Sequence, residues 1–204
     1  GSSYGVYTVG SLSLNDIKMF SPIEKGAFYD TFSIPDEEFA LVTFHPETMA
    51  AQENIQFSQA MKNALATISK DLFVVITMPN ADTQGSIYRE AILQLKNENG
   101  KGILLIENFG KTNYFSAMHY CKLLIGNTSS GILEAASFGK YVVNVGDRQK
   151  GRAQSNNIIN CSFVALDIIE ATEKAKKLDK YVGANVYFKE AVADNVIKIV
   201  KESL

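Results

Sequence analysis

Short runs of apolar residues alternate with longer segments of helical periodicity along most of this chain. The runs are continuously apolar, so both faces of the resulting strands should be covered. We expect strands at residues 6–9, 40–44, 73–77, 102–106, 123–125 and 141–145, with a further candidate at 163–166. We expect helices at residues 15–20, 52–69, 86–98, 113–121, 131–138, 168–178 and from about 187 to the end, the last with Val192, Val196, Ile197 and Val200 inward. This alternation predicts a doubly wound α/β fold around a parallel sheet.

Size and charge fit one compact domain. The chain has 204 residues, 46% of them hydrophobic, which is enough to bury one core. A formal net charge of -2 gives no basic field for nucleic acid or an anionic membrane surface. No apolar run approaches the length of a membrane span, and no secretory signal is visible. We set residues 1–3 aside as an expression remnant and expect residues 4–204 to form the domain.

The cysteines and histidines are too few for a zinc site. Cys121 and Cys161 lie in apolar surroundings, which favours reduced thiols in a cytoplasmic protein over a disulfide. There is no CxxC pair, and the chain has two histidines, His45 and His119. We therefore expect neither a metal nor a cofactor. His119 falls inside an expected helix, and we interpret it as structural.

The strongest candidate site is the segment 126–139, which begins Gly-Asn-Thr-Ser-Ser-Gly. It follows an expected strand, and in doubly wound sheets ligands bind beyond the carboxyl ends of the strands. Backbone N–H groups at the start of the next helix favour an anion such as diphosphate, with added donors from Thr128 and Ser129. Glu134 could grip the two hydroxyls of a ribose. The alternative is that Thr128 or Ser129 only caps the helix and Glu134 is an ordinary first-turn acid.

Three more polar segments follow expected strands. The basic loop 146–152 carries Arg148 and Arg152, which could neutralise a diphosphate or simply be solvated. His45 stands between a strand and a proline, where it could contact phosphate, act as a general acid, or be held by backbone. Asn80 lies in an expected turn. Its side chain could form hydrogen bonds with one edge of a ligand, or the segment could be a turn without a binding role.

Together these segments resemble the C-terminal half of the hydrolysing UDP-N-acetylglucosamine 2-epimerases of the bacterial sialic-acid-pathway type. The resembling segments are residues 41–48, 79–82, 126–135, 138–139 and 143–152. The last, Val-Asn-Val-Gly-Asp-Arg-Gln-Lys-Gly-Arg, is the most specific. Relatives that keep the nucleotide product usually carry Asp-Ser-Gly-Gly where this chain has Asn-Thr-Ser-Ser-Gly. There are also departures: Tyr-Phe-Lys-Glu at 187–190 replaces a Tyr-Gly-Asp-Gly pattern, and Thr128 replaces a frequent serine.

The resemblance implies a fold and a set of ligand contacts. The family has two Rossmann-like domains around a cleft, the GT-B arrangement, and this chain would be the C-terminal, UDP-binding domain. Residues 6–12 would be the crossover between the domains, with residues 10–12 as hinge. The implied roles are diphosphate binding for Thr128 and Ser129, ribose binding for Glu134, phosphate contact for Arg148 and, less firmly, Arg152, contact along the nucleotide for Asn80, and a catalytic place near phosphate and sugar for His45.

The reaction that the resemblance implies has two steps. A base takes the proton from sugar C2 while UDP leaves C1, and water then adds to the glycal to give N-acetylmannosamine. The family's catalytic carboxylates lie in the N-terminal half. The expected partners are therefore a UDP-sugar and that missing domain, and the isolated chain should bind UDP weakly and turn over nothing measurable. Monomer or homo-oligomer stays open.

Four alternatives remain open from the residues. The sugar nucleotide could be UDP-N,N'-diacetylbacillosamine, since the residues that read its C4 and C6 substituents are expected in the missing half. The parent could be a non-hydrolysing UDP-N-acetylglucosamine 2-epimerase. A glycosyltransferase of the same architecture is disfavoured by the Gly-Asp-Arg-Gln block. A non-catalytic nucleotide-binding module is the alternative of another class.

Overall fold

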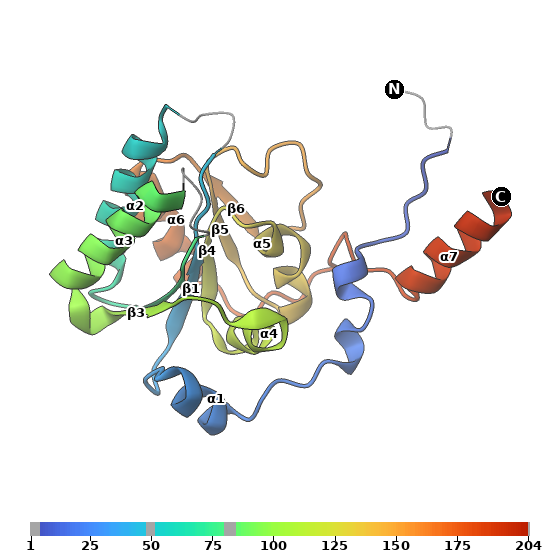
Figure 1. Cartoon of the computed structure of the whole chain (residues 1–204), viewed down its shortest axis with the longest axis horizontal. Helices are drawn as coiled ribbons and strands as arrows, with labels where there is room; N and C mark the ends of the chain where they lie inside the picture. The colour runs from blue at the N-terminus through green and yellow to red at the C-terminus, as the bar shows by residue number, and fades with distance from the viewer. Residues whose placement is uncertain (1–4, 48–51, 80–84, 204) are drawn as a thin grey trace.

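A six-stranded parallel sheet forms the centre of this chain (Figure 1), in a computed structural model that describes residues 5–47, 52–79 and 85–203. The strand order is β3-β2-β1-β4-β5-β6. The strands are β1 (Phe39–Thr43), β2 (Phe73–Thr77), β3 (Ile103–Ile106), β4 (Leu123–Gly126), β5 (Val142–Val145) and β6 (Ile158–Cys161). This order reverses between β1 and β4, which is the switch point of the doubly wound fold.

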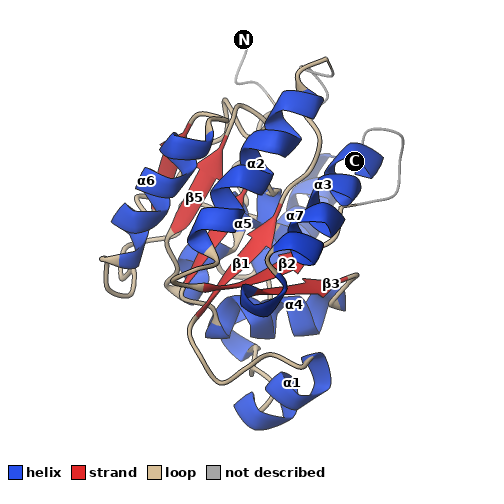
Figure 2. Cartoon of the chain, turned by 90° about the vertical axis from the view of Figure 1, so that its left-hand side faces the viewer, coloured by secondary structure: helices blue, strands red, loops and turns tan. Residues whose placement is uncertain are grey.

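Helices cover both faces of the sheet, as the continuously apolar strands require (Figure 2). Ala40 and Val42 of β1 face one core, and Phe39 and Leu41 face the other. The first core is closed by α2 (Asn54–Ile68), α3 (Gly85–Glu98) and α6 (Ala165–Lys176). The second is closed by α1 (Lys25–Phe32), α4 (Gly110–Tyr120) and the 3-10 turn η4 (Ala135–Phe138). The remaining helical elements are α5 (Ser129–Leu133), α7 (Val192–Ser203), η1 (Leu12–Leu14), η2 (Ile17–Met19) and η3 (Gly100–Gly102).

Two expected strands were wrong. Residues 6–9 form no strand, and Val6 and Tyr7 are 70% and 58% exposed. The segment 163–166 is not a strand either: Phe163 packs into the first core and α6 begins at Ala165. The edge strand β6 lies earlier, where Ile158–Cys161 pairs with β5. A four-residue apolar run does not specify which of two neighbouring segments the sheet will pair.

The expected helices also needed correction. Residues 15–20 hold only the short turn η2, and α1, for which no helix was expected, follows them with Phe28 and Tyr29 buried in an aromatic cluster with Tyr120. The helix expected at 131–138 is two short pieces, α5 and η4, that meet at Glu134.

The last helix does not bury the whole stripe expected of it. It begins at Val192, which is fully buried, but Ile197 and Val200 are 51% and 52% exposed. In Figure 1, α7 projects from the body of the sheet, near the extended N-terminal segment. Among the described residues, the apolar side chains of α7 are therefore buried only at its start.

The two cysteines differ in burial. Both thiols are free; Cys121 is buried and Cys161 is half-buried. Within the described ranges, no helix is long and apolar enough to cross a membrane.

Candidate functional site

Neighbouring strands bring most of the expected site residues to one edge of the sheet. Thr43 at the end of β1 pairs with Gly126 at the end of β4, and Gly126 pairs with Asn144 of β5. The expected site residues in the segments after these strands are His45, Thr128, Ser129, Glu134, Arg148 and Arg152. This edge is the carboxyl end at the switch point, where the fold predicts a ligand.

Asn127 joins the ends of β1 and β4, and sequence reasoning gave it no role of its own. Its side chain is fully buried. It accepts a hydrogen bond from the His45 backbone N–H at 2.7 Å and donates one to the His45 carbonyl at 2.8 Å. Its own N–H donates to the Thr43 carbonyl at 3.2 Å. Asn127 thus holds His45 at the edge through hydrogen bonds to its backbone. The one sequence signal for Asn127 was that it is a polar residue directly after an expected strand.

The same residue anchors the basic loop. The carbonyl of Asn127 accepts from Arg148 Nη1 at 3.1 Å and from Gln149 Nε2 at 2.8 Å. Partial burial, together with repulsion from Arg152, lowers the pKa of Arg148. Because one nitrogen of its guanidinium is held at the end of β4, Arg148 is fixed as a charge beside the start of α5.

Arg152 lies apart from these contacts. It lines a hollow of about 890 Å³ beside the ends of β5 and β6, together with Asp147 and Lys150. Lys150 pairs with Asp147 at 2.9 Å. The structure therefore unites Arg148, and not Arg152, with the polar residues that follow β4.

Two glycines are required by close approach at this edge. Gly126 has φ 142°, and a Cβ there would lie 1.9 Å from the Thr43 carbonyl oxygen. Gly146 has φ 72°, and a Cβ there would lie 2.2 Å from Glu47 Oε1. That oxygen of the buried Glu47 accepts from the Asp147 N–H at 2.9 Å. At Gly126 and Gly146 the neighbouring chain therefore lies so close that a residue with a Cβ does not fit.

At the start of α5, one hydroxyl residue caps the helix, as the alternative interpretation of this segment expected. Thr128 is the N-cap, and its hydroxyl accepts from the Ser130 N–H at 3.5 Å. Ser129 is the first residue of the helix. The hydroxyl of Ser130 is bonded to Tyr114 of α4 at 2.7 Å, and burial raises the pKa of that tyrosine. Of these hydroxyl residues, Thr128 and Ser130 thus have protein partners already.

Glu134 is not a first-turn acid. It is the C-cap of α5, 5% exposed, and burial raises the pKa of its carboxyl group. Ser13 donates a hydrogen bond to Oε1 at 2.5 Å, and Oε2 has no hydrogen-bond partner among the described residues. A buried carboxylate oxygen without a donor is costly, so this site favours a ligand that carries hydroxyl donors.

The remaining sequence candidates stand elsewhere. Asn80 lies outside the described residues. His119 is an exposed residue of α4 with its ring packed edge-on against Tyr120, 4.9 Å between centroids, and its interpretation as structural stays a prediction. No group of three or more His, Cys, Asp or Glu side chains that could hold a metal occurs in the part of the chain that the structure describes.

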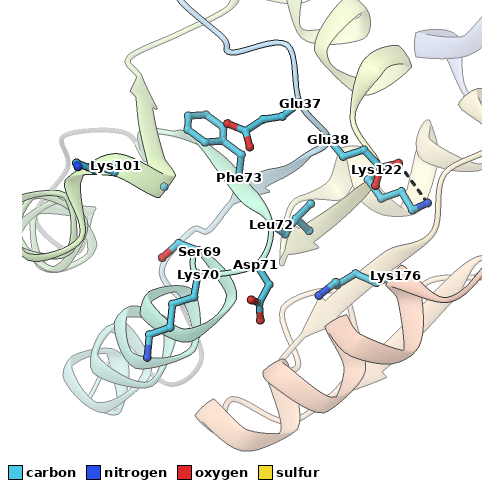
Figure 3. A pocket seen from close by; sticks show the side chains of 11 residues that line it. Glu37, Glu38, Ser69, Lys70, Asp71, Leu72, Phe73, Lys101, Lys122 and Lys176 are labelled. Carbon is cyan, nitrogen blue, oxygen red and sulfur yellow. Dashed lines mark ion pairs between the residues drawn. The ribbon is translucent and has the colours of Figure 1, made fainter.

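A second hollow, of about 420 Å³, lies at the opposite edge of the sheet (Figure 3). It is lined by charges of both signs around the amino ends of β1 and β2, and Lys122 pairs there with Glu38 at 3.4 Å. Since ligands of doubly wound sheets bind at the carboxyl ends, the first edge remains the better candidate.

Fold and candidate site together define a Rossmann-like α/β domain with a polar, partly basic edge at its switch point. The chain belongs to the UDP-N-acetylglucosamine 2-epimerase family, whose model matches residues 2–201.

Named relatives agree with this family. A GDP/UDP-N,N'-diacetylbacillosamine 2-epimerase (hydrolyzing) of Campylobacter jejuni is 33% identical over 170 residues, which are 83% of this chain and 44% of the relative. A UDP-N,N'-diacetylbacillosamine 2-epimerase (hydrolyzing) of Legionella pneumophila is 29% identical over 184 residues, 89% of this chain and 48% of the relative. The chain thus spans about half the length of these relatives.

Solved structures share the fold. The UDP-GlcNAc 2-epimerase of Methanocaldococcus jannaschii, in complex with UDP-GlcNAc and UDP, has a TM-score of 0.72 at 14% identity, over 96% of this chain and 54% of that one. The S. aureus MnaA–UDP structure has a TM-score of 0.71 at 15% identity, over 98% and 55%. They confirm the Rossmann-like α/β fold expected for one half of a GT-B-type enzyme.

Proposed function

We propose that residues 4–204 are the UDP-binding, C-terminal domain of an enzyme that converts UDP-N-acetylglucosamine to N-acetylmannosamine and UDP. The observation that carries this proposal is Glu134, a buried carboxylate with one unpartnered oxygen, at the end of the short helix α5 that follows β4. The two hydroxyls of a ribose are donors of the kind that oxygen lacks. Membership of the epimerase family supports uridine as the nucleoside.

The other site residues would hold the diphosphate. Thr128 and Ser129 lie at the start of α5, where backbone N–H groups favour an anion. Arg148 adds a charge anchored on Asn127. His45 would contact phosphate or sugar as the catalytic residue of this half, with Asn80 along the nucleotide and Arg152 as an outer contact.

The chain's own chemistry would be stabilisation of a leaving group. As the C1–O bond breaks, negative charge grows on the diphosphate, and a fixed Arg148 and the N–H groups of α5 stabilise that charge. The proton at C2 must be removed by the carboxylates expected in the missing N-terminal domain. Elimination of UDP, followed by hydration with inversion at C2, would then need both halves.

Exposed apolar surface supports a second domain. Ile197 and Val200 on α7, and Val6 and Tyr7 in the extended N-terminal segment, are all more than half exposed. Exposed apolar side chains on these two segments could be covered by another part of the protein. We infer that the missing N-terminal domain covers it, in a cytoplasmic enzyme whose oligomeric state stays open.

A second substrate has a specific observation in its favour. Both named relatives that act on UDP-N,N'-diacetylbacillosamine are hydrolysing enzymes, at 33% and 29% identity. UDP-N,N'-diacetylbacillosamine is therefore the alternative substrate of the parent enzyme. The UDP contacts of this chain would be the same for both sugars.

Calorimetric titration of the chain with UDP, UDP-N-acetylglucosamine and ADP tests the nucleotide. We expect the uridine ligands to bind better than ADP, and Glu134→Ala to weaken UDP while the control His119→Ala does not. Equal affinity for ADP, or equal effects of the two variants, would contradict the site.

The whole enzyme tests the reaction. Incubation with UDP-N-acetylglucosamine should release free N-acetylmannosamine and UDP, and the diacetylbacillosamine nucleotide should be tried in parallel. Recovery of intact UDP-N-acetylmannosamine would instead indicate the non-hydrolysing class.

A further inference from the structure

Glu134 is held by a residue from the far end of the chain. The hydroxyl of Ser13 donates to Oε1 at 2.5 Å across a sequence separation of 121 residues. Glu134 Oε2 has no partner among the described residues, although the side chain is buried. The two carboxylate oxygens of Glu134 therefore differ: Ser13 holds Oε1, whereas Oε2 accepts no hydrogen bond from the described residues.

Ser13 is itself fixed in place. It lies in η1, whose Leu14 is fully buried, and its hydroxyl is bonded to that of Ser11 at 2.8 Å. Ser11 in turn donates its N–H to the Tyr187 carbonyl at 2.9 Å, and Lys189 Nζ reaches the Thr8 carbonyl at 3.1 Å. The segment around Ser13 is thus tied to the segment that leads into α7.

That second segment also holds the turn that carries Glu134. Asn185 Nδ2 donates to the Leu133 carbonyl and to the Ser137 hydroxyl, each at 2.8 Å. Glu134 stands between these two residues, at the junction of α5 and η4. The Glu134 side chain, through Ser13, and its neighbours Leu133 and Ser137, through Asn185, are consequently held by chain segments outside the strand–helix unit to which they belong.

We propose that Ser13 is a positioning residue, which holds Oε1 of Glu134 so that Oε2 is presented to the ribose of the bound nucleotide. This inference rests on the proposed function. A freely rotating carboxylate would have to be ordered when the ligand binds, and a pre-oriented one does not, so the Ser13 hydroxyl increases affinity. The same hydrogen bond opposes the effect of burial on the pKa of Glu134 and favours the charged, accepting form.

Removal of the hydroxyl should act through the ribose alone. We expect Ser13→Ala to weaken UDP binding about tenfold in calorimetry. Its affinity for 2′,3′-dideoxyuridine diphosphate, which lacks both ribose hydroxyls, should stay within about twofold of that of the unmodified chain. Ser13→Thr keeps a hydroxyl and should restore UDP binding. Ser69→Ala, at the opposite edge of the sheet, is the matched serine control and should change neither affinity.

A double-mutant cycle separates positioning from a general structural role. In a Glu134→Ala background, adding Ser13→Ala should cause no further loss of UDP affinity. Equal weakening for UDP and the dideoxy ligand, or additive losses in the cycle, would overturn the inference and leave the proposed function standing. Failure of the unmodified chain to bind UDP would overturn the proposed function and this inference with it.

Discussion

Asn127 is the residue on which the geometry of the candidate site most depends. Its amide holds the backbone of His45 on one side, and its carbonyl holds Arg148 and Gln149 on the other. All of its polar groups are used inside the protein, so its role is to fix the relative positions of three loops.

Asn127→Ala should lower the free energy of unfolding by about 2–3 kcal/mol, because the N–H and carbonyl of His45 lose their buried partners. Urea unfolding measures the change, and hydrogen exchange of the His45 amide should become faster. The control Asn63→Ala, on the exposed face of α2, should stay within about 0.5 kcal/mol. Equal effects of the two variants would mean that the Asn127 contacts contribute nothing.

Gly126→Ala should destabilise the chain by more than about 2 kcal/mol, because the new Cβ would overlap the Thr43 carbonyl. At Gly100 a Cβ meets nothing within 4 Å, so Gly100→Ala is the matched control. Thermal unfolding of both variants decides the matter. If Gly126→Ala destabilises the chain no more than Gly100→Ala does, the ends of β1 and β4 can separate.

Glu134 should make stability depend on pH in the direction opposite to most carboxylates. Burial raises its folded-state pKa above 4.5, so the folded chain holds this proton more tightly than the unfolded chain. Stability from this group is present below 4.5 and is lost as the pH rises through the folded-state pKa. Relative to wild type, Glu134→Gln should therefore gain stability as the pH rises. Urea unfolding across pH measures this, and a constant difference would contradict it.

At the scale of elements, the segment after β4 shows how tertiary contacts divide a helix. Residues 129–138 carry helical periodicity, yet α5 ends at Leu133 and η4 follows. Hydrogen bonds from Ser13 and Asn185 act at this junction. A local pattern could not predict the break, because the partners come from both ends of the chain.

The two faces of α7 should respond differently to truncation. Val192→Ala removes a fully buried side chain and should speed hydrogen exchange of the α7 amides, with a loss of about 2 kcal/mol in their protection. Ile197→Ala changes a half-exposed position and should alter protection by less than about 0.5 kcal/mol. In the parent enzyme the second variant should become costly; if it stays neutral there, no domain covers α7.

At the scale of the whole molecule, the strand order places the site. The order reverses between β1 and β4, and the segments that follow β1, β4 and β5 meet at the carboxyl edge of the sheet, where ligands of this fold bind. Apart from Asn80, which lies outside the described residues, the proposed ligand contacts follow the strands at this edge. The carboxylates that transfer protons to and from the sugar are expected in the missing N-terminal domain.

The chain alone should therefore bind UDP without catalysis. UDP at 100 times its dissociation constant should stabilise the fold by about 2.7 kcal/mol, and ADP at that concentration should do so less. NMR of the chain with UDP-N-acetylglucosamine should show no N-acetylmannosamine. Turnover by the chain would mean that it contains its own base.

Several features were readable in the sequence. Continuous apolar runs at residues 40–44, 73–77, 102–106, 123–125 and 141–145 correspond to β1 to β5, because a strand buried on both faces needs apolar residues throughout. The strands expected at residues 6–9 and 163–166 were wrong, because a short apolar run indicates contact with other apolar groups and does not specify pairing in the sheet. Thr128, Ser129 and Arg148 became candidate site residues because they follow expected strands.

By itself, the sequence determined the layers, the parallel sheet and the polar segments at its carboxyl edge, since these follow from periodicity and from position after strands. Only the tertiary structure decided that β6 is Ile158–Cys161, that Asn127 organises the edge, that Arg148 donates to the Asn127 carbonyl, and that Ser13 holds Glu134. The physical reason is range. Periodicity is a property of neighbours in the chain, whereas a hydrogen bond between residues 121 positions apart exists only after the chain has folded.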